Sequence, residues 1–66
     1  MEIVIENPFK YRFVLYNPFK RHTIEGNFLF EAPVDARDTQ LALKETHVEY
    51  EIWLEDRDGN RVAIPR

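Results

Sequence analysis

The feature that most constrains the fold is an alternation of apolar and polar residues with a period of two, which recurs along the chain. The clearest stretches are E-I-V-I-E at 2–6, Y-R-F-V-L-Y at 11–16, T-I-E-G-N-F-L-F-E-A at 23–32 and T-H-V-E-Y-E-I-W-L-E at 46–55. In an extended strand this spacing places every second side chain on one face, and β-branched and aromatic residues favour such half-buried surfaces. The sequence therefore predicts four strands, each with one apolar face.

A fifth strand follows from D-R-D-G-N-R-V-A-I-P at 56–65. Asp-Gly between alternating runs is a strong hairpin signal, because Gly59 or Asn60 adopts positive φ at little cost. The predicted strand contains Val62 and Ile64, and Pro65 ends it.

The stretch Y-E-I-W-L-E-D-R-D-G-N-R-V at 50–62 is similar to the last hairpin of many immunoglobulin-like sandwiches, in which D-x-x-G-N-x-V recurs. That resemblance bears on the fold alone. We predict one all-β, antiparallel domain over residues 1–66, with five or six strands in a small immunoglobulin-like sandwich or a partly open barrel.

The segment P-V-D-A-R-D-T-Q-L-A-L-K-E-T at 33–46 is ambiguous. Leu41 and Leu43 alternate as in a short strand, whereas Asp35 is a suitable N-cap for a helix that would include Lys44. The apolar positions do not recur every three and four residues, so such a helix has no clean buried face. We favour a loop and a strand, and the alternative is an α+β fold with one short helix around 35–45.

The four residues N-P-F-K occur twice, at 7–10 and at 17–20. Proline fixes φ and pushes the preceding residue toward extended geometry, so Asn-Pro is typical of a strand end followed by a turn. We interpret the two copies as the ends of the strand at 11–16, with Phe9 and Phe19 folding over the ends of the core. The N-P-F tripeptide also resembles the ligand that endocytic EH domains bind in a turn conformation, which implies display of the same two phenylalanines.

Composition argues against catalysis. The chain contains neither serine nor cysteine, which removes the two commonest nucleophiles, disulfides and thiolate metal ligands, and its two glycines form no phosphate loop. Glu45, His47, Glu49 and Glu51 alternate in a row from which a metal site or an acid–base pair can be drawn, but a solvated sheet face has the same pattern. We expect no enzymatic activity, no metal, no cofactor and no small-molecule substrate. Without a long apolar segment or a signal sequence, a cytoplasmic location is the default expectation.

Several apolar residues fall in the polar register of the predicted strands. They are Val4, Val14, Tyr16, Leu29, Trp53 and Ala63. If the strands share a sheet, these side chains form a band on its outer face, and aromatic anchors within a charged rim are typical of protein–protein interfaces. The leading hypothesis is a binding or assembly module, with a protein partner or a second copy at Trp53, Tyr16, Val14, Leu29 and Val4.

Two further hypotheses remain. A designed scaffold without a biochemical function would account for the absence of serine and cysteine and for the regular turn chemistry. A small barrel that binds single-stranded nucleic acid would use Lys10, Arg12, Lys20 and Arg21, although the net charge of −3 disfavours a phosphate-backbone binder.

Overall fold

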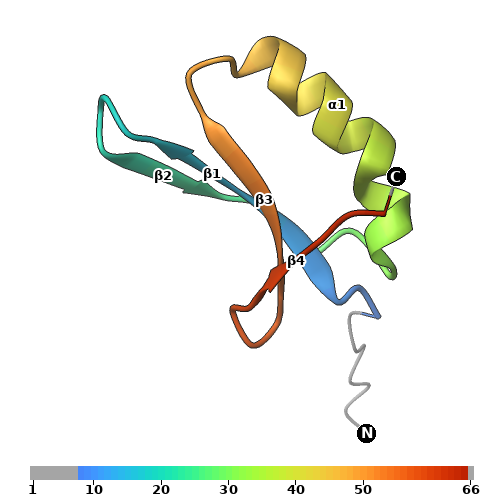
Figure 1. Ribbon diagram of the computed structural model, residues 1–66. Coiled ribbons are helices and arrows are strands. Elements are labelled where there is room, and N and C mark those ends of the chain that lie inside the picture. Colours follow the sequence, from blue (N-terminus) through green and yellow to red (C-terminus); the bar gives the residue numbers. More distant parts are fainter. Residues whose placement is uncertain (1–7, 66) are drawn as a thin grey trace, which may run out of the picture.

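The computed structural model describes residues 8–65 and has mixed α+β architecture (Figure 1). Its elements are β1 (Tyr11–Asn17), β2 (His22–Glu25), the 3₁₀ helix η1 (Pro33–Ala36), α1 (Arg37–Thr46), β3 (Glu51–Asp56) and β4 (Arg61–Val62). The strands form one antiparallel sheet in the order β2-β1-β3-β4, and α1 packs on one side of it. Within the described residues the sheet is neither closed into a barrel nor stacked on a second sheet, so the α+β alternative is closer than the all-β sandwich.

The core lies between one face of the sheet and the helical segment. Phe13 is paired with Leu54, and Leu15 is paired with Ile52, so these side chains share the face that packs against η1 and α1. Phe13, Leu15, Leu54 and Ala36 are buried, and around them pack Tyr11, Phe30, Leu43, Tyr50, Ile52, Val62 and Ile64. The inward register predicted for residues 11–15, 52–54 and 62–64 is confirmed.

The strand predicted within residues 33–46 is wrong, because this segment is helical. Pro33 begins η1, where its fixed φ suits a first turn, and Asp38 and Lys44 lie at the ends of α1 where their charges complement the helix dipole. Residues 40–45 are good helix formers, and two alternating leucines are too short a pattern to outweigh that preference. The helix indeed lacks a wide buried face: no residue of α1 is fully buried, and Leu43 packs against the core.

The strand predicted at 46–55 begins later than expected, at Glu51. Residues 47–50 form a turn, because α1 continues to Thr46 and the chain must then reverse direction. The backbone N–H of Tyr50 donates to the carbonyl of His47 at 3.1 Å. Val48 was expected in the core but is exposed, whereas Tyr50 reaches the core cluster.

The strand predicted at 23–32 is interrupted after Glu25. The N–H of Gly26 donates to the carbonyl of Phe13 at 2.9 Å, and pairing resumes only at an isolated bridge between Tyr11 and Phe30. The intervening residues are more numerous than those opposite them, so they form a bulge that shifts the alternation. Phe28 was expected to point inward, but its ring instead lies beside the guanidinium of Arg12.

The hairpin predicted at 56–62 is confirmed. Gly59 has φ of 85°, and the Asp56 carboxylate accepts hydrogen bonds from the backbone N–H groups of Asp58 and Asn60 at 2.9 and 3.0 Å. The ladder pairs Leu54 with Val62, as the alternation predicted. Ile64 follows the short β4 and still packs against the core.

The second N-P-F-K copy does end a strand, as predicted. β1 finishes at Asn17, whose buried side chain accepts hydrogen bonds from the N–H groups of Phe19 and Lys20 at 2.9 and 3.1 Å. The expectation that Phe19 covers the core is wrong, since 83% of it is exposed. Burial of Asn17 also means that the N-P-F tripeptide is not displayed as a unit. The strand predicted at 2–6, with Val4, and the start of the first copy lie outside the described residues.

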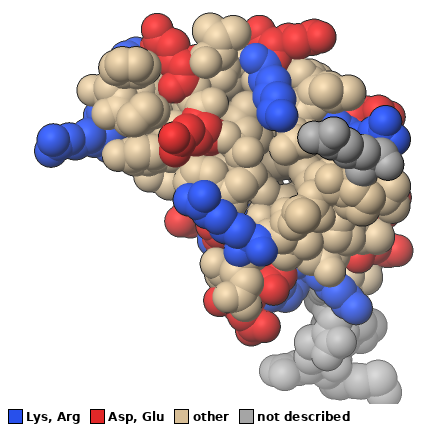
Figure 2. Space-filling view, viewed as in Figure 1, with Lys and Arg blue, Asp and Glu red and all other residues tan. Residues whose placement is uncertain are grey.

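Basic and acidic side chains are intermixed on the face that Figure 2 shows, with no continuous area of either colour. One face of the sheet is apolar and packs against the helix. The second face is therefore the place to search for a site.

Candidate functional site

The candidate site is the sheet face opposite α1, called here the outer face. Alternation places Arg12, Val14 and Tyr16 of β1 on this face, because Phe13 and Leu15 point into the core. The register then adds the residues paired with them: Trp53 lies opposite Val14, Glu55 opposite Arg12, and Glu51 opposite Tyr16, while β2 contributes Glu25 and Thr23. Arg61 of β4 joins them as the partner of Glu55.

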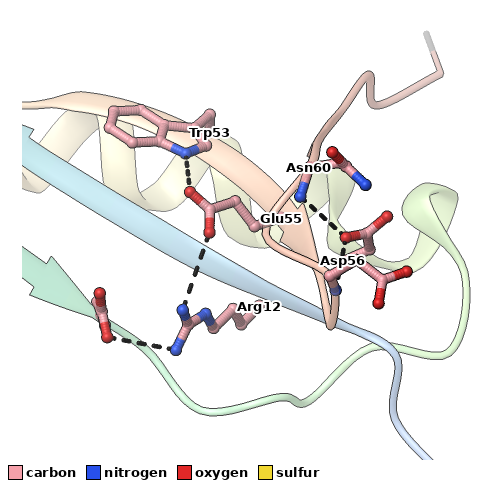
Figure 3. A network of polar contacts seen from close by, with 7 residues as sticks. Arg12, Trp53, Glu55, Asp56 and Asn60 are labelled. Carbon is pink, nitrogen blue, oxygen red and sulfur yellow. Dashed lines mark hydrogen bonds and ion pairs between the residues drawn. The ribbon is translucent and has the colours of Figure 1, made fainter.

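Trp53 is held on this face by contacts on two sides. The guanidinium of Arg61 lies 4.0 Å from the centroid of the indole ring, within the range of a cation–π interaction. The indole N–H donates a hydrogen bond of 2.7 Å to Oε2 of Glu55, as Figure 3 shows. A charged acceptor makes that bond stronger than a neutral one. The ring is therefore fixed in orientation while it remains only partly buried.

The network continues from Glu55 across the sheet through Arg12. One guanidinium nitrogen of Arg12 lies 3.8 Å from Oε1 of Glu55, and the other terminal nitrogen lies 3.4 Å from Oε2 of Glu25 (Figure 3). Arg12 thus bridges β3 and β2 over the central strand. Its Nε is buried and has no hydrogen-bond partner in the described part of the chain. The charges of the two carboxylates compensate the cost of holding this guanidinium away from water.

Phe28 borders the network through two arginines. Its ring centroid lies 5.1 Å from the guanidinium carbon of Arg12 and 4.4 Å from that of Arg57. The Arg57 Nε–H also donates to the Phe9 carbonyl at 3.0 Å. The bulge after β2 is what brings Phe28 to this position, so the irregular segment extends the outer face beyond the regular ladder.

The structure brings together part of the predicted band. Trp53, Val14 and Tyr16 share the outer face, but Val14 is 3% exposed and supports the surface without being accessible from solvent. Leu29 is exposed in the segment between β2 and the bridge at Phe30, outside the regular ladder. Ala63 follows β4, and Val4 lies outside the described residues.

The arginine–glutamate network was not predicted. Its signal was present in the alternation, because Arg12, Glu25 and Glu55 occupy the same register as Val14 and Trp53. Recognising them as partners required the strand order, which the sequence did not reveal. Arg61 was likewise one residue from the predicted turn, and only the observed register places it over Trp53.

The four basic residues of the nucleic-acid hypothesis do not gather. Lys20 and Arg21 lie in the turn after β1, whereas Lys10 precedes β1, so a strand length of about 20 Å separates the two ends. Arg12 is engaged by two carboxylates. No concentrated basic stripe forms from these residues, which weakens the case for a phosphate-binding surface.

The row of acidic and histidine residues is also dispersed. Glu45 belongs to α1, His47 and Glu49 to the following turn, and Glu51 to β3. His47 packs edge-on against Tyr50, and its Nδ1 lies 2.8 Å from Oγ1 of Thr46. Among residues 8–65, no group of three or more His, Asp or Glu side chains is arranged to hold a metal ion. In the same range, no helix is long and apolar enough to cross a membrane.

No protein-family model, curated protein or solved structure matches this chain.

Proposed function

We propose that this chain is a non-enzymatic binding module that presents its outer face to a protein partner. The observation that carries the proposal is the fixed position of Trp53 between Arg61 and Glu55, on the side of the sheet opposite α1. Tryptophan, tyrosine and arginine are the residue types that dominate interface energetics, and Trp53, Tyr16 and Arg61 combine all three.

Rigidity favours this role. A side chain that is already ordered loses less conformational entropy when a partner covers it. The hydrogen bond to Glu55 and the stacking of Arg61 impose that order on Trp53 before binding. Arg12, Glu25 and Glu55 then form a rim of alternating charge, which suits a partner with charged groups of both signs around an apolar centre.

The test compares capture of a partner by immobilised wild type, Trp53→Ala and Tyr16→Ala, with Leu41→Ala as the matched control. Leu41 is exposed on α1, so its truncation removes apolar area away from the outer face. We expect Leu41→Ala to bind as wild type does, and Trp53→Ala to bind roughly 30-fold more weakly, as for a central interface residue.

Because Trp53 is the single tryptophan of the chain, its fluorescence reports on the same surface. Addition of the purified partner should shift the emission of the wild type, since the ring becomes desolvated. Circular dichroism must show that Trp53→Ala still folds. Equal binding by Trp53→Ala and Leu41→Ala, or an unchanged emission spectrum in the complex, would contradict the proposal.

A further inference from the structure

The strand β2 differs from the other edge of the sheet in being open to pairing. It lies at one end of the strand order, all four of its residues are exposed, and it contains neither proline nor lysine. The opposite edge, β4, has two residues and is followed by Pro65, both of which limit pairing with another strand. Within residues 8–65, β2 is thus the longer and the less protected of the two edges.

The backbone of β2 alternates in the direction of its hydrogen-bonding groups. Gly26 directs its N–H to the carbonyl of Phe13 in β1. In an antiparallel ladder, residues two apart point the same way, so Ile24 and His22 also face β1. Thr23 and Glu25 therefore direct their N–H and C=O groups away from the sheet.

Three exposed apolar side chains lie within or near β2. Phe19, Ile24 and Leu29 are all exposed, and they lie before, within and after β2. The hairpin of β1 and β2 projects away from α1, as Figure 1 shows, while α1 contacts η1 and β3. The helix accordingly does not shield this end of the sheet.

We propose that β2 pairs with β2 of a second copy, antiparallel, about a two-fold axis at Thr23. In this register Thr23 faces Thr23 of the second copy, and their outward N–H and C=O groups form a reciprocal pair of hydrogen bonds. Arg21 ends the turn before β2 with φ of 52° and lies outside the ladder, but the symmetry brings its positive charge to the end of the strand where Glu25 of the second copy lies, and it repeats that approach. Opposite charges and paired threonines both stabilise antiparallel neighbours.

The axis runs perpendicular to the sheet, so both outer faces lie on one side of the assembly and both helices on the other. Trp53 stays uncovered, and this inference therefore does not rest on the proposed function.

The first measurement is absolute mass by light scattering at about 10 µM and about 1 mM, a range suited to a small, transient interface. Wild type should shift from monomer toward dimer. A monomer at both concentrations would overturn the proposal.

Charge reversal tests the register. Arg21→Glu and Glu25→Arg each place like charges opposite one another, so each variant alone should dimerise at least roughly tenfold more weakly. An equimolar mixture restores two complementary pairs and should recover the dimer as a heterodimer. Glu25→Arg also loses the contact with Arg12 of its own chain, and that contact stays lost in the mixture. Recovery of the dimer in the mixture would therefore be due to the charge pairs between the two copies. Dimers unaffected by either reversal, or no recovery in the mixture, would refute this register.

A backbone variant provides a test that is independent of charge. Thr23→Pro removes the outward N–H at the axis, and with it two hydrogen bonds per dimer, without removing a donor to β1. Its circular dichroism should match that of wild type, and its mass should stay monomeric. Glu51→Arg, a charge reversal on β3 away from this edge, should dimerise as wild type does. A dimer formed by Thr23→Pro would show that β2 is not the interface.

Discussion

At the scale of single residues, a buried amide determines how β1 ends. Asn17 is fully buried, and its side-chain oxygen accepts two backbone N–H groups of the turn that leads into β2. The amide nitrogen has no partner in the described residues. The role of this side chain is therefore that of an acceptor. Its oxygen takes the place of the water molecules to which the N–H groups of Phe19 and Lys20 would otherwise donate.

We predict that Asn17→Ala lowers the free energy of unfolding by about 1–2 kcal/mol, because two backbone donors lose their acceptor. Urea unfolding of wild type and variant measures the difference. Asn27→Ala is the matched control, since Asn27 is exposed in the bulge and should change stability by less than about 0.5 kcal/mol. Equal effects at the two asparagines would show that the turn does not depend on the side chain of Asn17.

At the scale of elements, the two glycines serve different needs. A Cβ added to Gly26 would lie 3.1 Å from the carbonyl oxygen of Phe13, so this position requires a small residue for close approach of the chains. A Cβ on Gly59 would meet nothing within 4 Å, but the backbone has φ of 85°. Gly59 is thus required for its conformation alone.

Replacement of Gly59 tests this conformational origin. Gly59→Ala should lower the free energy of unfolding by about 1 kcal/mol, because alanine disfavours the left-handed region. Gly59→Asn should lower the free energy of unfolding by less, since asparagine tolerates positive φ better than alanine does. Thermal unfolding of the three proteins gives the ranking. Greater stability of Gly59→Ala than of Gly59→Asn would mean that the turn relaxes to another conformation.

The elements that could be predicted from the sequence are those whose signal is local. β1 follows from its alternation and its Asn-Pro end, and the β3–β4 hairpin from Asp-Gly. The helix was missed because Leu41 and Leu43 mimic a strand and because α1 buries so little of itself. The bulge after Gly26 was missed because extra residues in one strand leave no mark in the alternation until the opposite strand is known.

The candidate site divides in the same way. The alternation along each strand was enough to predict that Trp53, Val14 and Tyr16 lie on one face, and the observed register agrees. The contacts of Arg12 with Glu25 and Glu55 join three strands, so they depend on the order β2-β1-β3, which no local pattern encodes. Burial of Val14 likewise depends on its cross-strand neighbours, Glu25 of β2 and Trp53 of β3, which its place in the alternation does not reveal.

At the scale of the whole molecule, stability depends on a small core. The buried apolar cluster comprises Phe13, Leu15, Ala36 and Leu54, at the junction of β1, β3 and the helical segment. A chain of this length has a free energy of unfolding of about 3–10 kcal/mol. The hairpin end of the sheet, where β2 is exposed, contributes little to that core.

Two leucines separate the contribution of the core from that of the surface. Leu54 is 1% exposed at the centre of β3, whereas Leu41 on α1 is 54% exposed. Leu54→Ala removes the same atoms as Leu41→Ala, but it leaves a cavity that the surrounding side chains cannot fully close. We therefore expect the free energy of unfolding to fall by about 3 kcal/mol in Leu54→Ala and by about 0.5 kcal/mol or less in Leu41→Ala. Urea titration measures both. The loss expected for Leu54→Ala is a large fraction of the stability of so small a domain, so this variant should unfold at a much lower urea concentration than wild type, while Leu41→Ala unfolds near the wild-type midpoint. Similar midpoints for the two variants would place the stabilising core elsewhere than between β3 and the helix.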